Sequence, residues 1–403
     1  MKKEIRGFII GVIFTTLITG TIVFASQGSK MIEVFYNNIG IFINGREVTP
    51  TDANGNIVEP FIYGGTTYLP VRAISEALGQ EVTWDGENSR IYIGELPLEL
   101  SFLALDNLIS ENKDKKIEEV TVSTVNELVS ELGSNKKINL KAGVYDLSKC
   151  SIEATDAVYW TAVDDGMQLN INGIVNMTLT GDTKGVTEII TDTNFAEVLY
   201  FENCGNITIE NIKAGHTPQE YECDAGVFEF LDSKKITVNN CYLYGCGSIG
   251  ISLWSVSGFE CNDTIITDCS LRGVNISRST DVVFNNTKIT ENRAYADAIL
   301  IYNNSDAVFN NCEISGNNNI EWSLIEISGY SKLTFNDSVI KDNTAKDTIC
   351  LFNLDGFGDY RMSEMTLNNC TIENNKNWYE YNVTEPVYND CTFKDNTFVE
   401  GGE

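Results

Sequence analysis

From about residue 120 the chain alternates apolar and polar positions in short segments, and one pattern then recurs. It reads apolar, any, apolar, any, Asn or Asp, small, any, apolar. Alternation of this kind gives strands, and a repeat of 21 to 32 residues is typical of solenoids, so we predict a mainly β fold of stacked coils. The Asn or Asp positions, called anchors below, are Asn211, Asn240, Asp263, Asn286, Asn311, Asp337, Asn369 and Asp390.

Two columns of residues can be read at fixed offsets from the anchors. Coils stack about 4.8 Å apart, which lets side-chain amides bond along a column. We therefore predict a parallel β-helix of about ten coils, right-handed by the usual chirality of parallel connections. The position after the anchor is small: Cys241, Thr264, Thr287, Cys312, Ser338, Cys370 and Cys391. The sixth position after it is Cys246, Cys269, Asn292, Asn317, Asn343, Asn375 and Asn396.

The region before the repeats has a different pattern. Residues 39–48 read as strand, Asn-Gly turn and strand. Pro70 precedes a helix predicted from Val71 to Leu78, which Gly79 ends, and two closing strands follow by residue 94. The predicted organisation is a small α+β domain over 31–94, a linker over 95–119 containing a short helix, and the β-helix over 120–398.

Residues 1–25 have the pattern of a secretory signal peptide. Lys2, Lys3 and Arg6 precede an apolar run, and Val23-Phe24-Ala25 fits a cleavage site after Ala25. The alternative is an uncleaved membrane anchor, for which the run is short. We expect a secreted or cell-surface protein that has no membrane segment after cleavage.

Residues 31–94 resemble the copper-amine-oxidase N-terminal-like domain, or stalk domain, of secreted bacterial proteins. The resemblance lies in Ile43-Asn44-Gly45-Arg46, in residues 61–72, in Val82-Thr83-Trp84-Asp85 and in Ile91-Tyr92-Ile93-Gly94. It implies a non-catalytic module on a secreted or surface-attached protein. Copper does not follow, because this stretch contains no His or Cys and no Met after Met31.

Residues 120–398 resemble right-handed parallel β-helix proteins of the pectin-lyase-like type. The entry segment from Ile138 to Leu147 and the repeats support the resemblance. It implies the fold and not an activity, because this fold supports many functions. The polygalacturonase-like signature fails, since Gly215-His216-Thr217 lacks a second Gly and no Arg-x-Lys follows. The pectate-lyase-like signature also fails, since no Asp-x-x-x-Asp cluster accompanies Arg278.

Composition narrows the classes of function. Asp and Glu number 57 against 28 Lys and Arg, a formal net charge of −29, so nucleic-acid binding is not expected. A single histidine rules out a site with two histidine ligands. No cofactor is predicted, and calcium bound by scattered carboxylates stays open. We expect a monomer, although the sequence does not decide the oligomeric state.

The 11 cysteines do not require a disulfide scaffold. Most of them share columns with Thr, Ser or Asn, so we predict buried small residues. Two pairs at equal offsets on adjacent coils, Cys370 with Cys391 and Cys246 with Cys269, stay open as bridges, because the coil spacing suits a disulfide.

The strand before each anchor presents the best candidate ligand face. Its outward pairs are predicted to be Tyr200/Glu202, Glu229/Leu231, Ser252/Trp254, Asn275/Ser277, Leu300/Tyr302 and Glu326/Ser328. Such a mixture of acids, amides and aromatics suits carbohydrate, while the alternative is an ordinary sheet face covered by a loop. The candidate ligand-binding residues are Glu202, Glu229, Trp254, Asn275, Tyr302 and Glu326.

A second candidate is the segment 215–226, which we expect to leave the coil and lie over that face. It holds His216 beside several acids, which could make the imidazole a general acid or base. The alternative is a turn residue with one structural hydrogen bond. Catalytic candidates are weak, namely His216, Arg278 and Asp232.

Two hypotheses about function follow. The first is a surface-associated β-helix protein that binds an extracellular or cell-wall polysaccharide, with the N-terminal domain as spacer or adaptor. The second is a polysaccharide lyase or glycoside hydrolase with a divergent site. A stiff rod without a ligand is a third reading. The sequence leaves open the glycan, the catalytic capacity and the mode of surface attachment.

Overall fold

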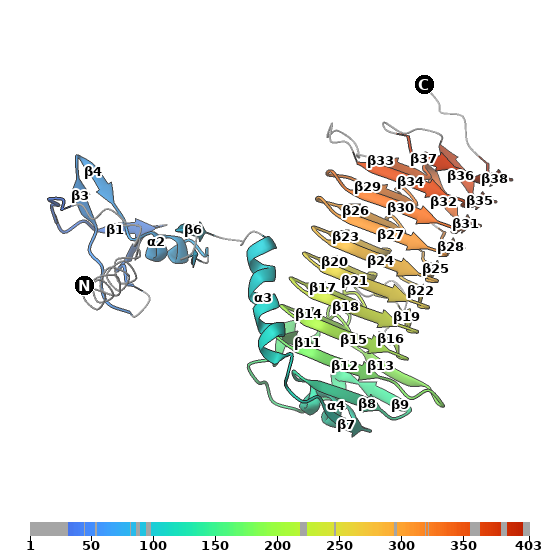
Figure 1. Cartoon of the computed structure of the whole chain (residues 1–403), viewed down its shortest axis with the longest axis horizontal. Helices are drawn as coiled ribbons and strands as arrows, with labels where there is room; N and C mark the ends of the chain where they lie inside the picture. Colours follow the sequence, from blue (N-terminus) through green and yellow to red (C-terminus); the bar gives the residue numbers. More distant parts are fainter. Residues whose placement is uncertain are drawn as a thin grey trace, which may run out of the picture. The chain divides into compact units, whose positions relative to one another are not determined.

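The computed structural model describes residues 31–43, 45–52, 55–80, 82–85, 89–93, 98–217, 224–245, 247–293, 296–318, 320, 322–354, 363–379 and 385–397. The expected signal peptide lies outside these residues. The chain divides into two compact units, residues 1–96 and 97–403 (Figure 1). Among the described residues, no helix combines the length and apolarity needed to cross a bilayer.

The described residues of the first unit form three antiparallel strand pairs and one short helix, in line with the predicted small α+β domain. Gly45 ends the first turn with φ +78°, a backbone conformation that glycine adopts readily. The helix ends one residue earlier than predicted, and Gly79 follows with φ +77°. The elements are β1 (Ile41–Ile43), β2 (Arg46–Val48), β3 (Phe61–Tyr63), β4 (Thr66–Tyr68), α2 (Val71–Ala77), β5 (Val82–Asp85) and β6 (Arg90–Ile93).

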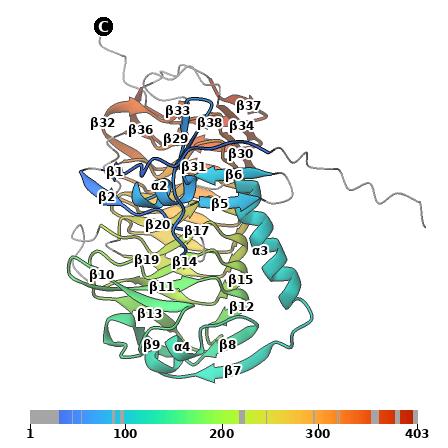
Figure 2. The ribbon, with the colours of Figure 1, turned by 90° about the vertical axis from the view of Figure 1, so that its left-hand side faces the viewer.

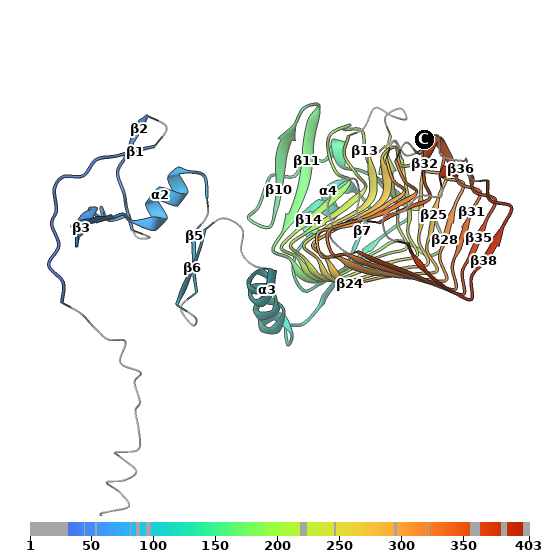
Figure 3. The same ribbon diagram turned by 90° about the horizontal axis from the view of Figure 1, so that it is seen from above.

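The second unit is a parallel β-solenoid with three long sheets (Figures 1 and 3). Sheet 1 contains β10 (Val158–Val163), β11 (Gly166–Asn172), β14 (Leu199–Glu202), β17 (Phe228–Leu231), β20 (Ile249–Trp254), β23 (Arg272–Ser277), β26 (Ile299–Tyr302), β29 (Ile325–Ile327) and β33 (Phe352–Leu354). Sheet 2 contains β7 (Glu118–Val122), β8 (Lys136–Leu140), β12 (Val175–Thr180), β15 (Gly205–Glu210), β18 (Lys234–Asn239), β21 (Ser257–Asn262), β24 (Thr280–Asn285), β27 (Asp306–Asn310), β30 (Lys332–Asn336), β34 (Glu364–Asn368) and β37 (Val387–Asn389). Sheet 3 contains β9 (Gly143–Asp146), β13 (Thr187–Thr191), β16 (Lys213–His216), β19 (Tyr242–Tyr244), β22 (Ile265–Thr267), β25 (Lys288–Thr290), β28 (Glu313–Ser315), β31 (Val339–Lys341), β35 (Thr371–Glu373) and β38 (Thr392–Lys394). A small pair is formed by β32 (Thr344–Cys350) and β36 (Lys376–Tyr379).

The solenoid has about seven turns, fewer than the ten that the repeats predicted. Its ends explain the difference. Among the described residues, β7, β8 and β9 at the start, and β37 and β38 at the end, extend sheets 2 and 3 and have no strand of sheet 1 in the same coil. In addition, β10 pairs antiparallel to β11 and does not belong to the parallel winding.

The repeat positions explain the coil geometry. All eight anchors adopt left-handed backbone angles, with φ between 48° and 59°, which Asn and Asp tolerate better than other non-glycine residues. They therefore form the turn between sheets 2 and 3. The alternating apolar residues point inward and stack along the axis, as Phe284 and Phe309 do with ring centroids 4.5 Å apart. Sequence repeat and core packing thus have the same period.

Two helices cover parts of the solenoid. The helix α4 (Val125–Glu131) lies against β7, β8 and β9 and buries Leu128 and Val129 over the first coil. The helix α3 (Leu98–Asn112) packs on β12 and β15, where the absent side chain of Gly205 leaves room for Leu105 and Ile109. The helix expected in the linker therefore belongs to the second unit.

Candidate functional site

The strands of sheet 1 are stacked one above another (Figure 2). From β14 to β29 they pair in parallel without a register shift, so the outward face places the predicted ligand residues in two straight columns. We call these two columns the sheet-1 face. The first contains Tyr200, Glu229, Ser252, Asn275, Leu300 and Glu326. The second contains Glu202, Leu231, Trp254, Ser277 and Tyr302.

Trp254 links three of the predicted residues. Its indole Nε1–H donates to the Ser252 hydroxyl at 3.0 Å, and that hydroxyl hydrogen-bonds the Glu229 carboxylate. The Trp254 ring also meets Tyr302 edge to face, with centroids 5.7 Å apart. Aromatic surface and hydroxyl-binding groups therefore lie side by side at the middle of the face. Ser252 and, on the next strand, Asn275 are both buried, which limits their reach to a ligand and leaves Glu229 as the more accessible polar group of this cluster.

A pair of carboxyl groups lies beside this aromatic cluster. Glu197 precedes β14, and its carboxyl accepts a hydrogen bond from the Gly226 N–H. Burial and the neighbouring Glu229 raise the pKa of Glu197 to about 8. Burial raises the pKa of Glu229 to about 6. Oε2 of Glu197 is buried and has no hydrogen-bond partner among the described residues. At neutral pH Glu197 is therefore mostly protonated and Glu229 mostly ionised.

A second charged group lies two to four strand spacings from Glu229, about 10–19 Å along the sheet. Arg272 approaches the fully buried Asp297 with 3.5 Å between Nη2 and Oδ2. Oδ1 of Asp297 accepts from both the backbone N–H and the hydroxyl of Ser323. Burial and the Asp297 carboxylate raise the pKa of Glu326 to about 7. The candidate ligand residues Glu229 and Glu326 are therefore not brought together.

The weak catalytic candidates lie in different places. His216 lies on β16 in sheet 3, is buried, and has Nε2 2.9 Å from the Ala196 carbonyl, so that nitrogen carries the proton. Burial lowers the pKa of His216 and keeps the ring neutral at pH 7. Asp232 and Arg278 lie in turns that follow β17 and β23, with φ of 46° and 51°. The structure does not assemble these three residues, and 218–223 of the expected covering segment lie outside the described residues.

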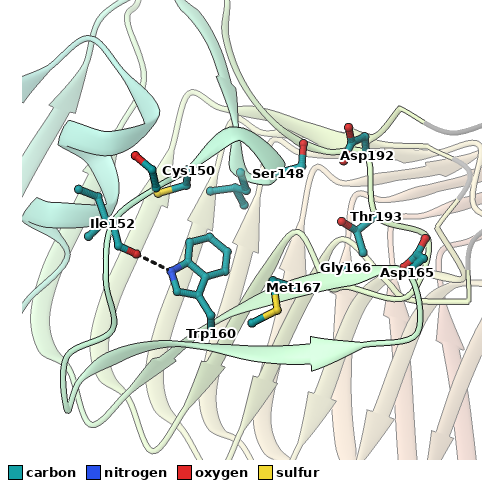
Figure 4. Close-up of a pocket in the computed structure, with 11 residues that line it drawn as sticks. Ser148, Cys150, Ile152, Trp160, Asp165, Gly166, Met167, Asp192 and Thr193 are labelled. Atoms are coloured by element: carbon teal, nitrogen blue, oxygen red, sulfur yellow. Dashed lines mark hydrogen bonds between the residues drawn. The ribbon is translucent and has the colours of Figure 1, made fainter.

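One pocket of about 440 Å³ lies near the start of the solenoid (Figure 4). The hairpin β10–β11 forms one wall, and the segment around the short 3₁₀ helix η1 (Leu147–Lys149) forms the other. Sequence reasoning missed it, because its residues lie before the first full repeat. It is lined by Leu147, Ser148, Cys150, Ser151, Ile152, Trp160, Asp165, Gly166, Met167, Asp192 and Thr193.

Cysteines and metals add little to the site. Cys370 and Cys391 are free thiols, each directed to the carbonyl two residues before it, so the bridge left open from the sequence is not formed. Cys269 is also a free thiol, while Cys246 lies outside the described residues. The described part of the chain contains no group of three His, Cys, Asp or Glu side chains arranged to hold a metal.

Comparisons with known proteins confirm both predicted family resemblances. The family model for the right-handed β-helix region matches residues 173–323. The model for the copper amine oxidase N-terminal domain matches at 18–93 and 53–127. No curated protein matches the chain.

Several solved structures are similar to part of this chain at low sequence identity. ORF18 of Geobacillus virus E2 is 12% identical, covering 80% of this chain and 69% of that one, with a TM-score of 0.44. The pectate lyase Pel9A is 11% identical, covering 71% and 81%, with a TM-score of 0.42. The endo-xylogalacturonan hydrolase from Aspergillus tubingensis is 10% identical, covering 70% and 86%, with a TM-score of 0.41.

Proposed function

We propose that the protein binds an extracellular or cell-wall polysaccharide along the sheet-1 face, with the first unit as spacer or adaptor. The main support is the cluster of Trp254, Tyr302, Ser252 and Glu229, where an aromatic pair adjoins hydrogen-bonding groups. Aromatic rings cover the apolar patches of a sugar, and carboxylates or hydroxyls bind its hydroxyl groups. Such a ligand agrees with the signal-like first 25 residues and the stalk-domain match, which both favour a location outside the cell.

Binding to a glycan array and to cell-wall preparations tests this proposal. The double variant Trp254→Ala/Tyr302→Ala should lose most binding while its melting temperature shows a folded solenoid. Trp322→Ala is the matched control, because Trp322 is 59% exposed and lies outside the cluster. Binding of the wild-type protein to no glycan, or unchanged binding of the double variant, would refute the proposal.

The carboxyl pair supports a second candidate, hydrolysis of the bound glycan. Glycoside hydrolases pair a protonated carboxyl with an ionised one. Near pH 7, Glu197, with a pKa of about 8, is mostly protonated, and Glu229, with a pKa of about 6, is mostly ionised. Release of new reducing ends should then be lost in Glu229→Gln and kept in Glu260→Gln, an exposed position on sheet 2. A lyase that uses His216 or Arg278 has less support, because the imidazole is buried in another sheet.

A further inference from the structure

The pocket near the start of the solenoid lies on the opposite side of the hairpin from the sheet-1 face. Trp160 on β10 pairs with Leu169 on β11, and Leu169 is buried in the core. Cross-strand partners point to the same side of a sheet, so the indole points inward. Met167 lies two residues before Leu169 and shares that side. The pocket is therefore a second, separate concave site.

Its inner wall is apolar and fixed in place. The indole Nε1–H of Trp160 donates to the Ile152 carbonyl at 2.9 Å, which sets the plane of the ring (Figure 4). Leu147 and Ile152 line the facing wall around η1, and Met167 on the hairpin keeps 47% of its surface exposed. An aromatic plane beside a polarizable thioether is a surface on which the C–H face of a flat ring can pack.

Its rim is rich in hydrogen-bond acceptors. The Asp165 carboxylate accepts from the backbone N–H groups of Asn194 and Phe195, at 2.6 and 3.3 Å. The Asp192 carboxylate accepts from Lys149 Nζ at 2.6 Å, and this contact lowers its pKa. These bonds hold the carboxylates in position, and each ionised carboxylate has about four acceptor sites, so capacity remains for a ligand. The ligand must therefore donate hydrogen bonds.

The charged residues of the pocket restrict the class of ligand further. Among the described residues that line the pocket, none is Lys, Arg or His, and two are Asp, so an anionic ligand is repelled. A cationic ligand has little to pair with, because Asp192 is already paired with Lys149 and the remaining Asp165 carboxylate is stabilised by two backbone N–H groups. The volume lies within the roughly 300–1,000 Å³ of small-molecule sites.

We propose that this pocket binds a neutral sugar unit, stacked on Trp160 and hydrogen-bonded through its hydroxyls to Asp165 and Asp192. Binding in this pocket does not require the sheet-1 face to bind a ligand. Uronic acids are anionic, so we expect the pocket not to bind them.

Calorimetry with the full chain tests the proposal, using cellobiose and N,N′-diacetylchitobiose as neutral probes, digalacturonate as the anionic probe and chitobiose as the cationic one. At least one neutral disaccharide should bind, and it should slow alkylation of Cys150, a partly exposed thiol in the pocket wall, by iodoacetamide. Peptide mass spectrometry separates Cys150 from the other thiols. Trp160→Ala should weaken binding about tenfold, the effect of losing one good aromatic contact.

Because Trp160 also packs on the core, a second variant protects the test from misfolding. Met167→Arg places a long side chain in the pocket from a half-exposed position and should abolish binding, while Val144→Arg, at an exposed position outside the pocket, should not. The Trp254→Ala/Tyr302→Ala variant should keep pocket binding, which separates the two sites. The proposal fails if neither neutral disaccharide binds, if only a charged probe binds, if Met167→Arg leaves binding unchanged, or if a bound sugar does not protect Cys150.

Discussion

The side-chain oxygen of Asn317 accepts hydrogen bonds from both the backbone N–H and the side-chain amide of Asn292, at 3.1 and 2.9 Å. The amide of Asn317 donates in turn to Asn343 and to the Ile289 carbonyl. The same arrangement continues through Asn375 to Asn396. This buried ladder satisfies the turn backbone in consecutive coils, and it makes each amide essential to both of its neighbours.

Replacing one amide in the ladder should therefore destabilise the solenoid strongly. Asn317→Leu removes the side-chain acceptor and donor and takes this partner from the N–H and amide of Asn292 and from the Ile289 carbonyl. The oxygen of Asn343 loses the amide donor and keeps the backbone N–H of residue 317. Each unsatisfied buried group costs about 1–3 kcal/mol, so the free energy of unfolding should fall by more than about 3 kcal/mol. Urea midpoints measure the change.

Ser328→Leu is the matched control, since Ser328 is a partly exposed residue after β29. A surface substitution of this kind should change the free energy of unfolding by within about 0.5 kcal/mol. Equal midpoints for the two variants would contradict the buried ladder.

The Arg272–Asp297 pair gives a second prediction. Arg272→Met leaves a fully buried carboxylate without its counter-ion, and losing one partner of such a pair costs about 3–5 kcal/mol, less here because Arg272 is partly exposed. Adding Asp297→Asn should restore much of the loss, because the amide oxygen can still accept from Ser323. A double-mutant cycle of unfolding free energies checks this. Additive losses would show that the two side chains do not interact.

The acid pair predicts how stability depends on pH. The folded pKa values of Glu197 and Glu229, about 8 and about 6, lie above their ordinary value of 4.5. The folded state therefore holds protons that the unfolded chain has released, so their contribution is full below pH 4.5 and is lost as pH rises through 6 to 8. Unfolding free energy should fall over this range. Glu197→Gln should flatten the slope and Glu260→Gln should not; equal slopes would exclude the pair as the cause.

The fold was predictable because two independent features of the repeat mark each coil. The anchors mark the left-handed turns, and the small and amide columns follow at fixed offsets, so sequence spacing alone aligned Asn292, Asn317 and Asn343. The same alignment placed Trp254, Ser277 and Tyr302 in one outward column. The number of turns was overestimated, because the described residues of the terminal repeats form strands in sheets 2 and 3 and no matching strand in sheet 1.

The site was only partly predictable. Glu197, Arg272 and Asp297 lie where the chain enters sheet 1, and the two-residue alternation does not set side-chain direction in such turns. The inward position of His216 follows from close packing: a side chain at Gly247 would contact its ring at 2.7 Å, and one at Gly245 its backbone at 2.8 Å. The sequence signal that could have indicated this packing is the pair of glycines, Gly245 and Gly247, in the neighbouring coil.

The small column gives a last prediction, because it explains why Cys, Thr and Ser alternate there. The Cys312 N–H donates to the Ser338 hydroxyl at 3.0 Å, and Cys312 Sγ lies 3.3 Å from the Asn310 carbonyl. Ser338 makes the same contact with the Asn336 carbonyl at 2.8 Å. Burial raises the pKa of Cys312 to about 11, so the thiol is an uncharged packing group.

Cys312→Ser should therefore change the free energy of unfolding by less than about 1 kcal/mol, since the hydroxyl replaces a weak donor with a strong one. Cys312→Leu should cost about 1–3 kcal/mol or more by overpacking the buried column. Denaturant midpoints of the two variants decide between this account and one that needs the sulfur itself, for which serine would be as damaging as leucine.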